Sequence, residues 1–205
     1  MELSILAYGD SLTWGRDPAT RERHAIRDRW PSVLQAELGA SRVHAEGLPG
    51  RTTVFDDHAN GINRNGAVHL PVVLSTHGPF DIVVLMLGTN DLKPSVCGMV
   101  SGTVAGLRRL VFIVRGFPYQ PAGPAPRVII VSPPILCTTS AGDGPRGGRE
   151  ITESEKLAPA IKSLCTEIGC EFFDAARVAN TSPVDGVHLN ALNTRAIGAA
   201  IARII

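Results

Sequence analysis

The chain has 205 residues, of which 44% are hydrophobic and 19% are charged, and its formal net charge is +1. This length suits a single domain, residues 1–205, with a sizeable core, and the composition excludes an intrinsically disordered chain. The near-zero charge offers no basic surface for nucleic acid. No apolar run approaches the roughly 20 residues needed to span a bilayer, so we predict no membrane partner.

The four cysteines follow no metal-binding pattern. Cys97, Cys137, Cys165 and Cys170 form no C-x-x-C pair and lack the spacing of zinc ligands. We therefore expect free thiols, no metal and no other cofactor. The first residues, Met-Glu-Leu-Ser, lack the positive region of a secretion signal. Together these features predict a cytoplasmic protein.

Along the chain, predicted strands alternate with predicted helices. The strands are expected at residues 3–8, 42–46, 81–87, 127–131 and 171–174. The helices are expected at residues 30–38, 70–77, 95–115, 152–168 (with a kink at Pro159) and from 191 to the end. Residues 81–87 are apolar without alternation, as in a central strand covered on both faces. The alternation predicts an α/β fold with a parallel sheet and helices on both faces.

Three segments between these elements are predicted to be loops. Residues 16–29 are rich in charge and are expected to form a solvated surface loop. Residues 54–66 carry Asp, Asn and Gly, which are turn residues. Residues 137–149 are rich in glycine and are expected to form a flexible loop, long enough to cover a site or a neighbouring subunit. We find no internal repeat and no second domain.

A serine directly follows the first predicted strand. The apolar residues Ile5–Tyr8 end at Gly9, and Asp10 and Ser11 come next. In open α/β sheets, ligands bind at the carboxyl ends of the strands, so Ser11 is a candidate nucleophile. Asp10 is expected to brace the loop by accepting hydrogen bonds from backbone N–H groups.

Near the end of the chain, an aspartate precedes a histidine by three residues. A serine hydroxyl needs a base to take its proton, and the base needs a group that orients it. His188 is the predicted base and Asp185 is its predicted orienting carboxylate, because the spacing lets both side chains meet on one turn. Taken alone, Ser11 also fits a turn or a helix N-cap, and His188 fits the start of a helix. Together they predict a serine hydrolase.

Acyl transfer also needs donors for the oxyanion that develops on the substrate. The candidates are the backbone N–H of Ser11, the backbone at Gly50, and the side-chain amide of Asn90. Asn90 follows the strongest predicted strand, so it is expected at the same sheet edge as Ser11. The alternative is that residues 88–91 form only a polar turn that closes the strand.

Four segments in this order resemble the conserved blocks of the SGNH, or GDSL, hydrolases. They are Gly9-Asp10-Ser11-Leu12, the Gly50 loop, Gly88-Thr89-Asn90-Asp91 and Asp185-x-x-His188. The sequence is most similar to the bacterial arylesterase and acyltransferase branch. The segments that carry this similarity are residues 9–15, 29–30, 46–53, 86–93, 131–134 and 185–189. The 137–149 loop has no matching segment.

The resemblance implies a flavodoxin-like three-layer sandwich with a five-stranded sheet and a Ser-His-Asp mechanism without metal. It implies Ser11, Gly50 and Asn90 as oxyanion donors. It also implies hydrolysis of short-chain, chiefly acetyl, esters through an acyl-Ser11 intermediate, with acyl transfer to alcohols or peroxide as a further activity. A homo-oligomer, often an octamer, is implied as well.

Three residues are predicted to bind substrate, which is a small-molecule ester. By the resemblance Trp14 lines the acyl or alcohol pocket, whereas core packing is the alternative for its ring. Lys93 is expected either to contact substrate or to bind the turn at Asp91. Val187 is the third predicted residue. Two other functions remain: an acetyl esterase acting on acetylated carbohydrates, and a ligand-binding module without catalysis on the same scaffold.

Overall fold

The computed structural model describes residues 2–59 and 61–205. Five parallel strands form one sheet in the order β2-β1-β3-β4-β5. The strands are β1 (Ser4–Gly9), β2 (Arg42–Gly47), β3 (Ile82–Met86), β4 (Arg127–Ser132) and β5 (Glu171–Asp174). This order is that of flavodoxin-like folds, in which ligands bind at the switch point between β1 and β3. The predicted α/β fold is confirmed.

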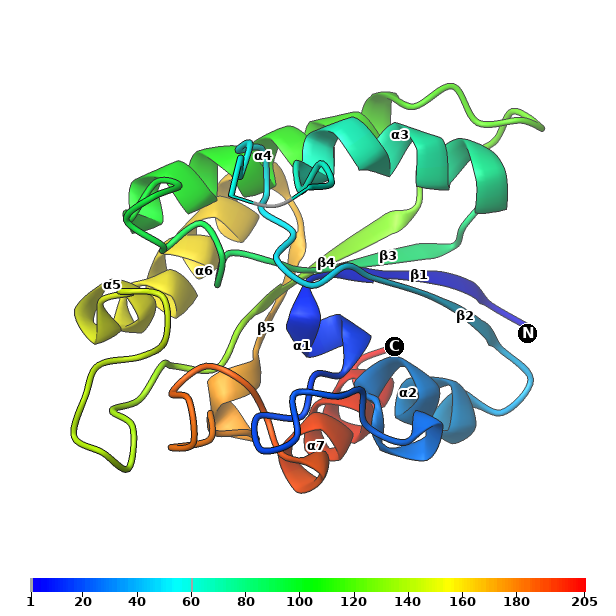
Figure 1. Cartoon of the computed structure of the whole chain (residues 1–205). Helices are drawn as coiled ribbons and strands as arrows, with labels where there is room; N and C mark the ends of the chain where they lie inside the picture. Colours follow the sequence, from blue (N-terminus) through cyan, green and yellow to red (C-terminus); the bar gives the residue numbers. More distant parts are fainter. Residues whose placement is uncertain (1, 60) are drawn as a thin grey trace.

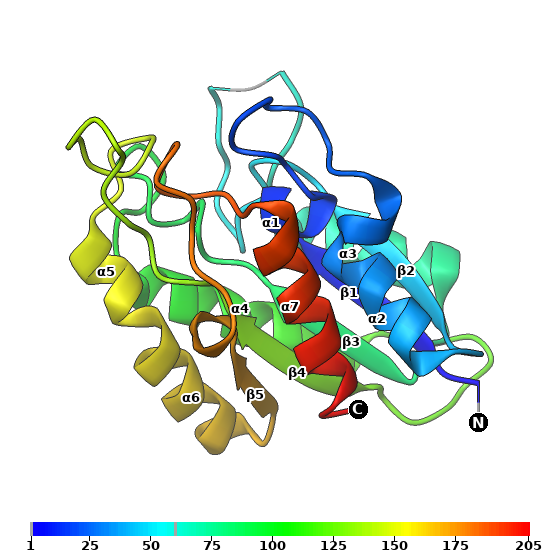
Figure 2. The ribbon, with the colours of Figure 1, turned by 90° about the horizontal axis from the view of Figure 1, so that it is seen from below.

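Helices cover both faces of the sheet, as predicted. They are α1 (Ser11–Trp14), α2 (Trp30–Leu38), α3 (Gly66–His77), α4 (Val100–Gly116), α5 (Ile151–Glu155), α6 (Leu157–Ile168) and α7 (Ala191–Ala202), with 3₁₀ turns η1 (Ile26–Asp28) and η2 (Ala175–Arg177). Helices α3, α4 and α6 lie on one face, and α1, α2 and α7 lie on the other (Figures 1 and 2). Within the described residues, no helix has both the length and the apolar character that a membrane crossing requires.

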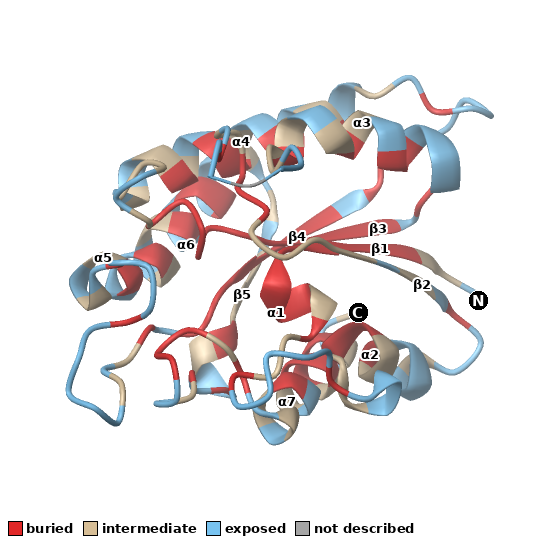
Figure 3. Ribbon diagram, in the orientation of Figure 1, coloured by how far each residue is buried: buried red, intermediate tan, exposed pale blue. Residues whose placement is uncertain are grey.

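The core is divided into two layers by the sheet. Side chains alternate along a strand, so Leu6 and Tyr8 of β1 join the layer under α3, α4 and α6. Ile5 and Ala7 join the layer under α2 and α7. All four side chains are fully buried, and the central strands β1, β3 and β4 are almost continuously buried, whereas the edge strand β2 is only partly so (Figure 3). The sheet is therefore a fixed platform for the loops at its carboxyl edge.

Two helices begin at other residues than predicted. Helix α3 begins at Gly66 rather than at residue 70, because the Asn65 side chain accepts a hydrogen bond from the Ala67 N–H at 3.0 Å and caps the helix there. Helix α4 begins at Val100 rather than at residue 95. The Val100 N–H donates to a carboxylate oxygen of Glu153 on α5, at 2.8 Å. The capping partner is 53 residues away, which hides this boundary from local sequence patterns.

The helix predicted over residues 152–168 is two helices. Pro159 lacks the N–H that would donate to the carbonyl of Glu155, four residues earlier. Helix α5 ends at Glu155 and α6 begins at Leu157, with Lys156 between them. Pro159 thus breaks the helix instead of only kinking it.

Residues 16–29 form a surface loop, as predicted, but the loop also makes buried contacts. His24 is buried, and its Nε2 lies 2.8 Å from the carbonyl oxygen of Leu189. The Arg29 side chain donates to the carbonyl of His24 at 2.8 Å. This segment therefore packs against the chain that follows His188.

Candidate active site

Ser11 lies where β1 meets α1, at the carboxyl edge of the sheet. Asp10 caps α1, because its Oδ1 accepts a hydrogen bond from the Leu12 N–H at 2.9 Å. This is the bracing role predicted for Asp10. Ser11 is the first residue of the helix, and its side chain is largely buried. The serine is therefore held at the β1/β3 switch point by local backbone geometry.

The turn at residues 185–188 carries the other two predicted triad members to this serine. His188 Nδ1 lies 2.6 Å from Asp185 Oδ2, and His188 Nε2 lies 3.0 Å from Ser11 Oγ. The turn requires glycine at position 186, where φ is +73° and a Cβ would lie 2.2 Å from the Cys137 carbonyl oxygen. Residues 177 positions apart thus form one continuous hydrogen-bonded chain.

Asp185 is ionised at neutral pH. Its Oδ1 accepts hydrogen bonds from the backbone N–H groups of Val187 (3.0 Å) and His188 (2.9 Å). Burial by itself would raise the pKa of Asp185, but the hydrogen bonds from the side chain and backbone of His188 outweigh it and lower the pKa to about 2. A charged carboxylate at this position orients the imidazole and stabilises its protonated form.

Asn90 lies in the turn after β3, next to the serine loop, as predicted. Its Nδ2 lies 3.0 Å from Asp10 Oδ2 and 3.1 Å from the carbonyl oxygen of Arg51. Its Oδ1 accepts a hydrogen bond from Arg149 Nη2 at 3.0 Å. Both ends of the amide are therefore engaged, and its orientation is determined by three partners.

Arg149 is a site residue that sequence reasoning missed. Its Nε donates to the Thr89 carbonyl at 2.6 Å, and its guanidinium also donates to the carbonyl of Arg146 and to Asn90. The side chain is buried, and burial lowers its pKa while the carboxylates around the site act in the opposite direction. An arginine within a glycine-rich loop has no local signal that distinguishes it from a solvated one.

Asp91 connects the turn after β3 to the Gly50 loop. Its two carboxylate oxygens accept hydrogen bonds from the N–H and the hydroxyl of Thr53, at 2.9 and 2.5 Å. Burial raises the pKa of Asp91 to about 6, although the bonds from Thr53 oppose this shift, and the carboxylate of Asp10 adds to it. Asp91 therefore sets the position of the segment that carries Gly50.

Ser11, His188, Asn90 and Arg149 line one cleft with a volume of about 340 Å³, here called the active-site cleft. Its lining residues are Ser11, Arg16, Pro49, Gly50, Arg64, Asn90, Lys93, Arg146, Gly147, Arg149, Val187 and His188. Of the predicted substrate-binding residues, Lys93 and Val187 line the cleft. Among the described residues, no group of three His, Cys, Asp or Glu side chains could hold a metal ion.

Residues 7–194 match the model of the GDSL-like Lipase/Acylhydrolase family. The chain belongs to this family. No curated protein sequence matches it. Among solved structures, it is similar to a protein assigned as an arylesterase from Agrobacterium tumefaciens str. C58, with 53% identity, a TM-score of 0.96 and coverage of 100% of this chain and 98% of that chain. Membership makes the protein a carboxylic ester hydrolase.

Two further solved structures agree with this assignment. A carbohydrate acetylesterase family member from Sinorhizobium meliloti is 48% identical, with a TM-score of 0.92 and coverage of 100% of this chain and 97% of that chain. The aryl esterase of M. smegmatis is 38% identical, with a TM-score of 0.87 and coverage of 98% of this chain and 97% of that chain. The GDSL-like hydrolase thus resembles the arylesterase branch over its whole length.

The structure gives the positions of two predicted substrate-binding side chains in this GDSL-like hydrolase. Lys93 does not bind the turn at Asp91, because its Nζ forms an ion pair with Asp57 Oδ2 at 2.9 Å. Trp14 is not among the residues that line the active-site cleft. The guanidinium of Arg23 lies 5.1 Å from the centre of the Trp14 ring and occupies one face of it.

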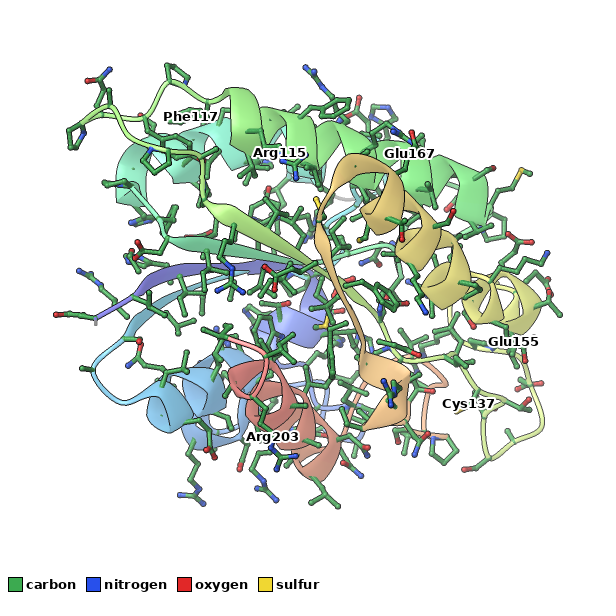
Figure 4. All side chains as sticks on the ribbon, turned by 180° about the vertical axis from the view of Figure 1, so that it is seen from behind. Arg115, Phe117, Cys137, Glu155, Glu167 and Arg203 are labelled. Atoms are coloured by element: carbon green, nitrogen blue, oxygen red, sulfur yellow. The ribbon has the colours of Figure 1, made fainter. Side chains whose placement is uncertain are left out.

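The glycine-rich loop of the GDSL-like hydrolase, residues 137–149, runs beside the turn that carries the triad. The Cys137 N–H donates to the Gly186 carbonyl at 3.1 Å, and the Arg146 N–H donates to the Asp185 carbonyl at 2.9 Å. Figure 4 labels Cys137 at the start of this loop. The loop is expected to cover a site or a neighbouring subunit; it is hydrogen-bonded to residues next to His188, and its last residues line the cleft.

Proposed function

We propose that the protein is a serine esterase that hydrolyses short-chain, chiefly acetyl, esters through an acyl-Ser11 intermediate. The observation that carries this proposal is the hydrogen-bonded chain from Asp185 to His188 to Ser11, with distances of 2.6 and 3.0 Å. These are the distances at which a base can take a proton from a serine hydroxyl.

In this mechanism neutral His188 accepts the hydroxyl proton of Ser11 as Oγ attacks the ester carbonyl. The imidazolium then gives this proton to the departing alcohol, and Asp185 stabilises the positive charge in between. Water, deprotonated in turn by His188, attacks the acyl-serine. The acid leaves, and the proton returns to Ser11.

The oxyanion is stabilised by the backbone N–H groups of Ser11 and Gly50 and by the amide of Asn90. All three residues line the cleft. Nδ2 of Asn90 contacts Asp10 and the Arg51 carbonyl in the free protein. Bound substrate therefore replaces one of these two acceptors, and the Asn90 amide keeps its hydrogen bond to the other.

The acyl group is short in this proposal because the active-site cleft, about 340 Å³, must hold both the acyl and the alcohol part of the ester. Arylesterase and carbohydrate acetylesterase are the names borne by the similar structures, and both fit acetyl transfer to serine. Lys93 and Val187 contact the substrate in this proposal.

The test is turnover of 4-nitrophenyl acetate at neutral pH by the wild type, by Ser11→Ala and by Ser75→Ala. Ser75 is an exposed serine on α3 and provides the matched control. We expect Ser11→Ala to lose at least about three orders of magnitude in kcat, and Ser75→Ala to match the wild type. An inactive wild type, or an active Ser11→Ala, would contradict the esterase and favour a ligand-binding module.

A second candidate is deacetylation of carbohydrates by the same residues. The 48% identical carbohydrate acetylesterase family member favours it. The two candidates differ in the alcohol, so release of acetate from acetylated sugars is compared with release from aryl acetates. A higher kcat/KM for the acetylated sugar would select this candidate, and no detectable acetate from any sugar would remove it.

Transfer of the acyl group to an acceptor other than water requires that water be excluded from the acyl-serine. In the single chain the cleft has a polar, charged lining. We therefore propose that transfer to alcohols or peroxide occurs only in a homo-oligomer, such as an octamer, whose subunits narrow each other's entrance. Formation of acid alone in the presence of added alcohol would contradict transfer.

All four cysteines are free thiols, which supports a cytoplasmic location.

A further inference from the structure

The active-site cleft is lined by five cationic side chains and by no acidic one. The cations are Arg16, Arg64, Lys93, Arg146 and Arg149. The cleft also contains Ser11 and His188, so these charges surround the place where the ester must bind. The proposed function assigns a substrate contact to Lys93 and gives no role to Arg16, Arg64 or Arg146.

Four of these five cations have no ion-pair partner within the described residues. Lys93 is the exception, since it pairs with Asp57 at 2.9 Å. The guanidinium of Arg149 donates only to uncharged oxygens, and Arg64 donates to the carbonyl of Pro49. No ion pair in the described part of the chain includes Arg16 or Arg146.

The nearby carboxylates do not cancel this charge. Asp10 and Asp185 lie beneath the cleft and are 0% and 3% exposed, so they contribute little to the surface that a ligand meets. Even when Asp10, Asp57 and Asp185 are all counted against the five cations, two positive charges remain. The formal net charge of the whole chain is only +1. The formal charge of the residues that line the cleft is therefore larger than that of the whole chain.

The glycine-rich loop holds two of these arginines in different positions. The Arg146 N–H donates to the Asp185 carbonyl at 2.9 Å, which anchors the residue beside the triad while its side chain stays exposed. At Gly147 φ is +83°, and a Cβ would lie 2.7 Å from Arg149 Nη1. Glycine at this position lets Arg149 fold back under Asn90 and leaves Arg146 at the rim of the cleft.

We propose that the natural ester carries an anionic group on its alcohol part, and that Arg16, Arg64 and Arg146 bind this group. The proposal rests on the proposed function. An acetyl group has only a methyl beyond the carbonyl carbon, so the charge must lie on the alcohol. A guanidinium binds carboxylate or phosphate through two parallel hydrogen bonds, which makes arginine suited to either anion.

The consequence for the reaction is that both products are anions. Water supplies the hydroxyl of the acetic acid, and its other hydrogen goes to the alcohol oxygen, so no further reactant is needed. The alcohol part enters as an anion and leaves with its charge unchanged. Electrostatic attraction to the cleft raises the local concentration of the ester and hence kcat/KM at low salt.

The experiment compares 4-acetoxybenzoate with its methyl ester, methyl 4-acetoxybenzoate. Both carry the same acetyl group on the same ring, and only the first is charged. The measured quantity is the ratio of kcat/KM for the charged ester to that for the neutral ester, in the wild type and in Arg146→Gln and Arg16→Gln. Taking this ratio across variants cancels the intrinsic reactivity of each ester. 4-Acetoxyphenyl phosphate provides the phosphate arm.

We expect each Gln variant to lower the ratio by about ten-fold, the effect of losing a hydrogen bond to a charged group. Arg146→Lys keeps the charge and should retain most of the ratio. Arg203→Gln removes a charge from the end of α7, outside the cleft, and should leave the ratio unchanged (Figure 4). Added salt should lower kcat/KM for the charged esters only.

The outcomes separate the two proposals. If the wild type hydrolyses the neutral ester but the ratio is the same in the wild type and in the Gln variants, the anionic substrate is wrong and the esterase stands. If the wild type hydrolyses no ester, the proposed function itself fails. The same ratio is formed for 4-acetoxyphenyl phosphate, with its kcat/KM divided by that of the neutral ester. If the Gln variants lower this ratio more than they lower the ratio for the carboxylate, the phosphate ester is the better substrate class.

Discussion

Two turns at the carboxyl edge of the sheet each carry a buried aspartate, and the two aspartates behave in opposite ways. Asp185 lies in the turn that ends at His188, and Asp91 lies in the turn after β3. They are 3% and 0% exposed. The pKa of Asp185 is lowered to about 2, whereas that of Asp91 is raised to about 6.

The difference arises from the depth at which each carboxyl lies in the protein and from its hydrogen-bond partners. Burial raises the pKa of both groups. Asp185 accepts from an imidazole and from two backbone N–H groups, and these bonds outweigh burial. Asp91 accepts from the hydroxyl and N–H of Thr53, and the carboxylate of Asp10 nearby disfavours a second negative charge. Two buried aspartates therefore differ in role: one holds a charge beside His188, and the other forms a structural contact with Thr53.

The largest expected effect comes from removing the charge at the first turn. Asp185→Asn keeps the size of the side chain but no longer stabilises the protonated imidazole of His188. We expect kcat to fall by about three to four orders of magnitude, as when this group is neutralised in other serine hydrolase triads. Steady-state turnover of 4-nitrophenyl acetate measures it. If a folded Asp185→Asn variant loses less than ten-fold in kcat, the charge of Asp185 is not needed for catalysis, and the proposed difference between the two turns is wrong.

A smaller effect is expected from Arg149, which connects the two turns. It binds Thr89 and Asn90 in the second turn, and its loop binds the Asp185 carbonyl through Arg146. Arg149→Lys keeps the charge and loses the planar fork that orients the Asn90 amide.

We expect Arg149→Lys to lower kcat by about ten- to a hundred-fold, because the oxyanion donor is misplaced rather than removed. KM should change less than kcat. Arg203→Lys, at the end of α7, is the control for the same exchange in an exposed arginine. A rise in KM with unchanged kcat would assign Arg149 to substrate binding instead.

The third prediction concerns stability at the second turn. The pKa of Asp91 is higher in the folded protein, about 6, than its ordinary value of 3.8. The folded state therefore binds the proton more tightly, and the free energy of unfolding decreases as pH rises through this interval. Asp91→Asn removes this pH dependence of the free energy of unfolding. The Asn side chain still offers an oxygen that accepts from the Thr53 N–H and an amide N–H that donates to the Thr53 hydroxyl oxygen.

We expect Asp91→Asn to be more stable than the wild type at pH 8 by on the order of 3 kcal/mol, since each unit of pKa shift corresponds to about 1.4 kcal/mol. The difference should vanish near pH 4, where Asp91 is protonated in the folded wild type. Urea unfolding at the two pH values measures it. A variant that is less stable than the wild type at pH 8 would show that Asp91 is stabilising as a charge.

Short local patterns accounted for much of the site. Ser11 follows an apolar strand, Asn90 follows another, and Asp185 precedes His188 by three residues. Each position depends on a few neighbouring residues, and the carboxyl ends of parallel strands necessarily meet at one edge. The central strands β1, β3 and β4 were likewise located from their apolar runs, because burial on both faces leaves no room for polar residues, whereas β2 and β5 are partly exposed edge strands with a weaker pattern.

The tertiary structure alone decided which charged side chains enter the site. Arg149 and Arg146 lie in a glycine-rich loop that looks solvated in the sequence, and Lys93 finds Asp57, 36 residues away. The start of α4 depends on Glu153 in the same manner. A long side chain reaches partners that are distant in the sequence, and its direction follows from packing and from glycine turns. The chain by itself thus determined the scaffold and the catalytic motif, whereas the charge of the cleft emerged only when the loops came together.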